Sequence, residues 1–130
     1  MKKAHLTRAI LLVDHGSRRP EANETLGDVV DLLRQISEID IVRLAHMELA
    51  SPSIEEGVEA CVKAGADEII VHPYFLVPGR HSTGDIPRMV EDAARRFPGI
   101  RVVITEPLGI HPKICEVIME RIRDAEGKRK

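Results

Sequence analysis

Four short runs of aliphatic residues alternate along the chain with longer segments whose apolar residues recur every three or four positions. Consecutive apolar residues predict strands that are buried on both faces, and the spaced pattern predicts amphipathic helices. The predicted strands cover residues 9–13, 40–48, 67–71 and 100–105, and a predicted helix follows each of them. This alternation is typical of a parallel sheet, because each parallel crossover is usually made by a helix.

Local signals predict where the helices begin and end. The first helix is expected over residues 21–39. In the second, Ser51 is the expected N-cap, Pro52 lies in the first turn and Gly65 marks the stop. Asp85 is expected to cap the third helix. All three helices are expected to bury an apolar stripe against the sheet.

The fourth helix is expected to open at His111 and Pro112. We expect its apolar residues to face inward; they are Ile114, Val117, Ile118 and Ile122. The sequence after them, residues 125–130, is mostly charged and is expected to be frayed.

These elements predict an α/β fold, with residues 1–130 forming a single three-layer α/β/α domain around a four-stranded parallel sheet. The expected strand order is 2-1-3-4, which places the two most apolar strands at the centre. The second strand contains Arg43, which indicates an exposed edge.

Composition excludes several classes of protein. The net charge is −2 and aromatic residues make up 2%, so the chain lacks the basic surface and the stacking residues that nucleic-acid binding needs. No apolar run is long enough to span a membrane, and the first residues lead into a strand and not a signal peptide. Cys61 and Cys115 are isolated, which indicates two core residues in a reducing compartment, and we expect the cytoplasm. Neither nucleotide-binding glycine motif, GxxxxGK[ST] or GxGxxG, is present.

Five of the six histidines lie at the ends of the predicted strands: His15, His46, His72, His81 and His111. Ligands of parallel sheets bind at the carboxyl ends of the strands, so this edge is the predicted site. Neutral imidazoles bind divalent metals and accept protons near neutral pH.

Glu48 ends the second predicted strand and is the expected carboxylate beside the imidazoles of this edge. Structural roles remain the alternatives for several residues: a buried hydrogen-bonded histidine for His46 and His72, and a helix N-cap for His111. Arg18, Arg19 and Arg80 gather at the same edge, which indicates an anionic ligand.

Four blocks of the sequence, in order, strongly resemble the sirohydrochlorin chelatase family, which includes SirB and the short CbiX proteins. They are "DHGSRRPEAN", "AHMELASPSIEEGV", "HPYFLVPGRHSTGDIP" and "PLGIHP", and the likeness covers residues 9–122. The resemblance implies a chelatase-like α/β fold. It also implies insertion of a divalent metal (Co²⁺, Fe²⁺ or Ni²⁺) into the carboxylate-rich tetrapyrrole sirohydrochlorin, in cobalamin or sirohaem biosynthesis.

Carried over by position, the resemblance implies that His15 and His81 are the essential histidines, and that Glu48 faces the metal with them. Substrate carboxylates are then expected to pair with the loops around Ser17, Arg18, Arg80 and Ser82. The short family form implies a homodimer. No histidine-rich tract or cysteine cluster is present, so we expect no iron–sulfur cluster and no tightly bound cofactor.

Two other functions fit the same edge. Phosphohistidine phosphatases also place a histidine after the first strand, in an Arg-His-Gly context, but here Asp14 precedes His15 and its charge repels phosphate. A non-catalytic carrier of metal or tetrapyrrole is the other alternative.

Overall fold

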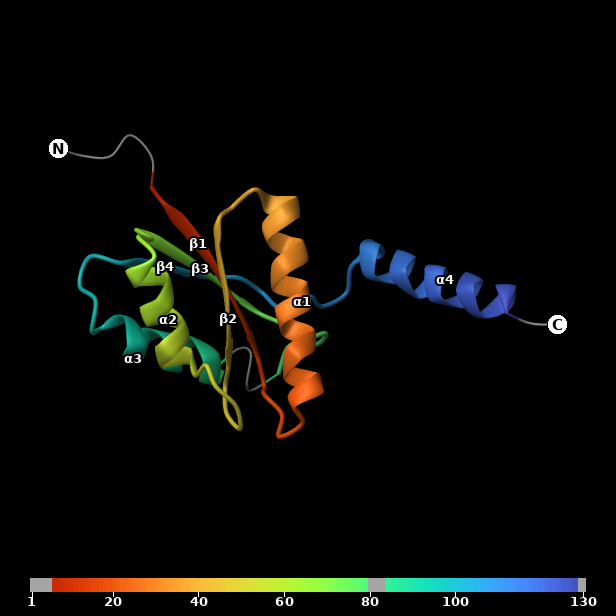
Figure 1. Ribbon diagram of the computed structural model, residues 1–130, viewed down its shortest axis with the longest axis horizontal. Coiled ribbons are helices and arrows are strands. Elements are labelled where there is room, and N and C mark those ends of the chain that lie inside the picture. The colour runs from red at the N-terminus through yellow and green to blue at the C-terminus, as the bar shows by residue number, and fades with distance from the viewer. Residues whose placement is uncertain (1–5, 80–83, 129–130) are drawn as a thin grey trace.

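The computed structural model describes residues 6–79 and 84–128 (Figure 1). Four strands form one parallel sheet: β1 (Arg8–Asp14), β2 (Ile41–His46), β3 (Glu68–Pro73) and β4 (Arg101–Ile104). Their order is β2-β1-β3-β4, as predicted. All four carboxyl ends therefore lie at the same edge of the sheet.

The helices are α1 (Pro20–Ser37), α2 (Ile54–Lys63), α3 (Ile86–Ala94) and α4 (Pro112–Gly127). Helices α2 and α3 lie on one side of the sheet and α1 lies on the other, which confirms the α/β/α layers (Figure 1). No helix in the described part of the chain is long and apolar enough to cross a membrane.

The larger core lies between the sheet and the α2–α3 layer. It contains the alternate strand residues Leu11, Val13, Ile69 and Val71, none of which is exposed. Gly57 brings α2 close to the sheet, because a Cβ there would lie 2.9 Å from Ala45 and from Leu11. The same core buries Cys61, and this burial raises the pKa of its thiol to about 11.

The smaller core lies under α1, where Leu26 and Val30 pack against the β1 and β2 residues Leu12 and Val42. β2 is an edge strand, as predicted. The guanidinium of Arg34 donates to the Val42 carbonyl at 2.8 Å and thus occupies part of this edge. Unpaired edges promote association between sheets, so this contact protects β2.

Two predicted helix starts are wrong in detail. The N-cap of α2 is Ser53, not Ser51: its hydroxyl oxygen accepts from the Glu56 amide at 3.1 Å, and the Glu56 carboxylate accepts from the Ser53 amide. This reciprocal capping box satisfies two helix-end donors and so outweighs the single hydroxyl at Ser51. Asp85 stands at the N-cap of α3, but its carboxylate pairs with Arg88 and does not cap the helix.

The prediction for α4 is wrong in a more important way. The helix extends away from the sheet on the side of α1 (Figure 1), and none of its described residues is fully buried. Periodicity shows which side of a helix is apolar, but it does not show which surface covers that side. Cys115 is consequently exposed and is not a core residue. The expected frayed tail is also too long, because α4 continues through Gly127.

Candidate functional site at the carboxyl edge of the sheet

His15 and Glu48 meet at the carboxyl edge of the sheet. His15 directly follows β1, and Glu48 lies two residues beyond β2. The Nε2 atom of His15 lies 3.0 Å from a carboxylate oxygen of Glu48, and the two side chains are 41% and 58% exposed. An imidazole nitrogen and a carboxylate oxygen are thus in contact with each other, and solvent reaches both side chains.

Backbone hydrogen bonds hold the two segments together beyond the ends of their strands. The Met47 amide donates to the Asp14 carbonyl at 2.9 Å, and the Glu48 amide donates to the His15 carbonyl at 3.1 Å. Gly16 makes this approach possible, since a Cβ at this residue would lie 1.9 Å from the Glu48 carbonyl oxygen. Its φ of +96° also favours glycine. The glycine that follows His15 is therefore a geometric requirement of the pair.

A second pair, Asp14 and His46, joins the same two strand ends. The Nδ1 atom of His46 lies 2.5 Å from a carboxylate oxygen of Asp14, and His46 is 1% exposed. The two residues are also register partners in the sheet. This contact confirms the structural alternative for His46. Sequence reasoning did not find the pair, although the position of an acid at the end of the neighbouring strand was a usable signal.

The loop after His15 is fixed by Asn23, another residue that sequence reasoning missed. Its side chain accepts from the Ser17 amide at 3.0 Å and donates to the Ser17 carbonyl at 2.7 Å. The Ser17 hydroxyl oxygen also accepts from the Arg19 amide. The Ser17 amide is thus already engaged, whereas its hydroxyl proton can still be donated. Arg18, the next residue, is exposed.

His72 and His111 have other partners. His72 lies in β3, and its Nδ1 atom is 2.7 Å from the Thr105 hydroxyl. That hydroxyl donates to the Glu106 carbonyl, so His72 Nδ1 is the donor and Nε2 keeps its lone pair. Burial lowers the pKa of His72 and favours the neutral ring. His111 caps α4 by accepting from the Lys113 amide at 3.1 Å, which confirms the predicted cap.

The remaining predicted site residues, Arg80, His81 and Ser82, lie outside the described residues, as does His5. Among the residues that are described, no group of three or more metal-ligating side chains comes together. His15 and Glu48 are the members of the predicted set that the structure brings into contact.

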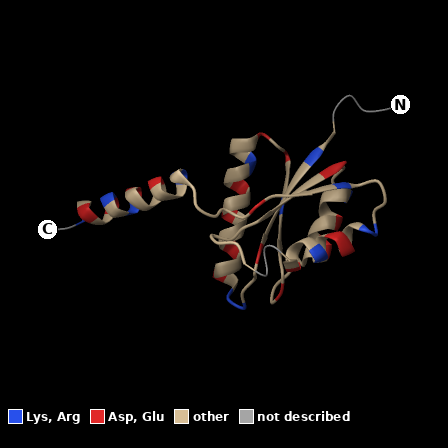
Figure 2. Ribbon diagram, turned by 180° about the vertical axis from the view of Figure 1, so that it is seen from behind, with Lys and Arg blue, Asp and Glu red and all other residues tan. Residues whose placement is uncertain are grey.

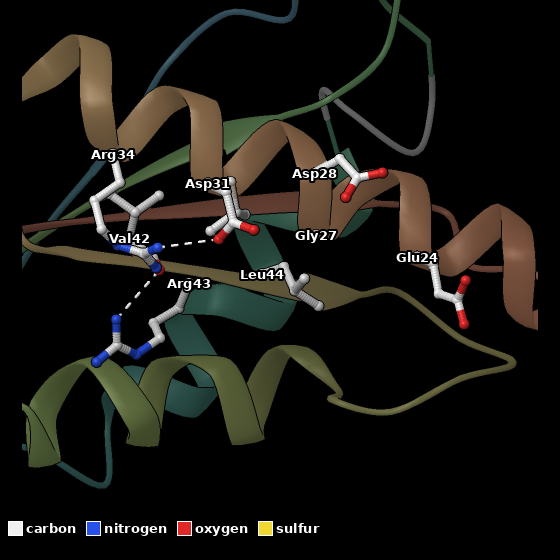
Figure 3. A pocket seen from close by; sticks show the side chains of 9 residues that line it. Glu24, Gly27, Asp28, Asp31, Arg34, Val42, Arg43 and Leu44 are labelled. Carbon is white, nitrogen blue, oxygen red and sulfur yellow. Dashed lines mark hydrogen bonds and ion pairs between the residues drawn. The ribbon is translucent and has the colours of Figure 1, made fainter.

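A groove of about 570 Å³ lies elsewhere, between α1 and β2. Figure 3 shows Glu24, Asp28 and Asp31 on the α1 side of this groove, with Arg43 on β2. At the strand edge of the groove, Arg34 forms a salt bridge with Asp31, and both Arg34 and Arg43 donate to the Val42 carbonyl. The groove is on the flank of the sheet and includes no strand-end histidine.

The fold and the site together define a class: a parallel α/β protein with an imidazole–carboxylate pair at the carboxyl edge of its sheet. The CbiX family model matches residues 9–125. The chain therefore belongs to the CbiX family, the family of the sirohydrochlorin chelatases.

Similar proteins support this membership. The chain is 46% identical over 114 residues to a chloroplastic sirohydrochlorin ferrochelatase of Arabidopsis thaliana, covering 88% of this chain and 51% of the relative. The crystal structure of the sirohydrochlorin chelatase SirB from Bacillus subtilis subspecies spizizenii with cobalt superposes with a TM-score of 0.85 at 34% identity, covering 92% of this chain and 51% of SirB. A cobalamin biosynthesis CbiX protein from Marinobacter aquaeolei gives a TM-score of 0.78 at 28% identity, covering 94% and 99%. The chain thus spans about half the length of the first two relatives.

Proposed function

We propose that this chain is a sirohydrochlorin chelatase that inserts a divalent metal, Co²⁺ or Fe²⁺ and also Ni²⁺, into sirohydrochlorin. The observation that carries the proposal is the contact between His15 and Glu48, in a fold that matches a chelatase solved with cobalt. The metal is a substrate here. A two-residue, solvent-exposed pair suits this task, because it leaves coordination positions open for the macrocycle.

Insertion of the metal requires two pyrrole N–H protons to leave as the ion enters the ring. The Nε2 atom of His15 would bind the ion or take a proton. We propose that His81 performs the complementary task and that Glu48 helps to strip water from the ion. The Gly16 carbonyl oxygen lies 3.3 Å from the other ring nitrogen of His15, Nδ1, and would orient the ring.

The substrate carries many carboxylates, and the proposal assigns their recognition to residues that follow β1 and β3 in the sequence. Arg18 and Arg80 would form charge-assisted hydrogen bonds with them, and the hydroxyl groups of Ser17 and Ser82 would donate. The contacts of Asn23 support this role, because they hold the Ser17 loop in one conformation beside His15.

The proposed enzyme works on metal and tetrapyrrole alone, without ATP, an iron–sulfur cluster or a tightly bound cofactor. The burial of Cys61 supports the proposed lack of an iron–sulfur cluster, since a buried thiol with a pKa of about 11 is a poor metal ligand at neutral pH. We further propose a cytoplasmic homodimer, and neither nucleic acid nor membrane as a partner. The product would enter cobalamin or sirohaem biosynthesis.

The test is anaerobic incubation of the protein with sirohydrochlorin and Co²⁺, Fe²⁺ or Ni²⁺ in turn, with metallation followed by visible absorption. We expect acceleration over the protein-free control, and a loss of about 100-fold or more in His15→Ala, the usual scale for a general base. Glu48→Gln is expected to lower the insertion rate by about 10-fold or more. Removal of a group that supports a metal-binding histidine commonly costs about that much in metal affinity or activity.

His111→Asn is the matched control, since it replaces a histidine of the same edge while keeping a side chain that can cap α4. It is expected to retain wild-type rates. Wild-type rates in His15→Ala would refute the assignment of this residue. Binding of sirohydrochlorin without any acceleration by the wild-type protein would instead indicate the carrier.

A further inference from the structure

Leu49 has a backbone conformation that is unfavourable for its side chain. Its φ is +71°, in the left-handed region, and among the described residues only Glu38 shares this property without being glycine. A Cβ in this conformation crowds the neighbouring backbone, so the conformation destabilises the fold unless another interaction compensates. Glycine and asparagine tolerate it, whereas a residue as bulky as leucine rarely adopts it.

Glu38, the other such residue, has an ordinary reason for its conformation. It follows the last residue of α1, and its amide donates to the Arg34 carbonyl at 3.1 Å. A left-handed residue at this position is a common way to end a helix. Leu49 lies between β2 and α2 and ends no helix, so its conformation needs a different explanation.

The surrounding backbone imposes the turn at Leu49. The chain leaves β2 at His46 and returns beside it at Pro52, whose carbonyl accepts from the His46 amide at 2.8 Å. Between these residues, the Glu48 amide donates to the His15 carbonyl at 3.1 Å. The connection is therefore a tight loop that is fixed at both ends and at Glu48, and the left-handed residue of this loop is Leu49.

The side chain of Leu49 does not contribute to the hydrophobic cores of the described chain. Met47 packs against the larger core and Glu48 contacts His15, but Leu49 packs against neither described core and is 49% exposed. Its partial burial therefore does little to compensate for the left-handed conformation. Glycine would form the same loop without crowding. A leucine here is explained if its side chain has a partner that the chain itself does not supply.

Other exposed apolar side chains occur at the same edge of the sheet. Leu76 and Val77 come shortly after the end of β3 and are 63% and 71% exposed. Charged residues of both signs also lie in the segments at this edge (Figure 2). The edge thus offers apolar contacts in addition to the His15–Glu48 pair, and such a combination is typical of a site for a small molecule.

We propose that Leu49 is a substrate-binding residue, whose side chain contacts the apolar face of the tetrapyrrole ring while the neighbouring Glu48 faces the metal. The inference rests on the function proposed above and adds a recognition contact to it. A tetrapyrrole has nitrogen atoms at its centre and a flat ring of carbon atoms around them. A carboxylate and an apolar side chain on consecutive residues match these two features. Binding of the ring buries Leu49 and thereby offsets the strain of the free protein.

Leu49→Gly tests both parts of this inference, because it removes the crowding and the side chain together. It is expected to raise the urea concentration at the midpoint of unfolding, since glycine adopts the left-handed conformation freely. It is also expected to bind sirohydrochlorin about 10-fold or more weakly, because the loss of an apolar contact from a binding site commonly costs that much. The affinity is measured without metal, by titration followed through the absorption of the tetrapyrrole. A gain of stability with a loss of affinity is not expected of a residue that only supports the fold.

Three further variants separate the backbone from the side chain. Glu38→Gly is the matched control: it relieves the same conformation at the end of α1, and it is expected to gain stability and to keep wild-type affinity. Leu49→Asn tolerates the left-handed conformation but presents a polar side chain, and it is expected to lose affinity as the glycine variant does. Leu49→Met keeps an apolar side chain of similar size and is expected to recover most of the affinity that Leu49→Gly loses.

Several results would overturn the proposal. Unchanged affinity in Leu49→Gly or Leu49→Asn would show that the ring does not contact this side chain, and a loss of stability in Leu49→Gly would show that leucine serves the fold. A lower mass of Leu49→Gly than of the wild type by light scattering would show that Leu49 packs against a second copy. Unchanged affinity in the variants rejects the role of Leu49 alone, whereas a wild-type chain that binds no sirohydrochlorin rejects the proposed function with it.

Discussion

At the residue scale, Gly16 allows the Glu48 carbonyl to lie where a side chain would begin. Gly16 and Gly99 have nearly equal φ values, +96° and +95°, but an added Cβ would meet nothing within 4 Å at Gly99 and would lie 1.9 Å from the Glu48 carbonyl oxygen at Gly16. Replacement by alanine therefore imposes the same backbone strain at both residues and a collision at only one of them. The difference between the two variants isolates the close approach of the two loops.

We expect Gly99→Ala to lower the free energy of unfolding by about 1 kcal/mol, which is the cost of a left-handed residue with a side chain. Gly16→Ala is expected to cost about 3 kcal/mol or more, because the 46–48 segment must move away. Urea denaturation measures both values. Gly16→Ala should also weaken metal binding while Gly99→Ala should not. Equal losses of stability in the two variants would contradict the proposed constraint.

At the scale of elements, the start of α2 controls the position of the segment that carries Glu48. The Ser53–Glu56 capping box fixes the first turn, and the His46 amide donates to the Pro52 carbonyl at 2.8 Å. Glu48 therefore lies in a short connection that is held at both ends, between the end of β2 and the capped helix. The stability of the cap and the position of the carboxylate are coupled.

We expect Ser53→Ala to lower the free energy of unfolding by about 1 kcal/mol, because it removes the acceptor for the Glu56 amide. Ser53→Asp supplies another acceptor and is expected to stay within about 0.5 kcal/mol of the wild type. Thermal or urea denaturation of the three proteins checks the order. If alanine and aspartate cost the same, the capping box does not stabilise α2.

At the scale of the whole molecule, the sequence predicts the features that follow from the local pattern of apolar and polar residues. Aliphatic runs identify the four strands and their relative burial, and this was enough for the order β2-β1-β3-β4. The strand-end rule also placed His15 and Glu48 at one edge, where the structure brings them into contact. The Asp14–His46 pair and the locking of Ser17 by Asn23 were missed, because both depend on the register and the loop geometry that tertiary packing sets. The burial of α4 was predicted wrongly for a different reason: its stripe is apolar, but its partner surface is not determined by periodicity.

The pH dependence of stability is a property of the whole fold to which His72 contributes. Burial lowers the pKa of His72 from its usual 6.5 in the folded chain. As the pH falls below about 6.5, the unfolded chain takes up a proton at this residue before the folded chain does. The contribution of His72 to the free energy of unfolding is thus fully present above this pH. It is lost as the pH falls toward the lowered pKa of His72 in the folded state.

We therefore expect the wild-type protein to lose more stability between pH 7.5 and pH 5.5 than His72→Asn. Asparagine keeps a donor for the Thr105 hydroxyl but does not titrate, so the proton uptake on unfolding disappears with little change in the contact. Urea denaturation at the two pH values gives the difference directly. An unchanged loss of stability between the two pH values in His72→Asn would mean that the buried ring of His72 does not set the acid sensitivity of the fold.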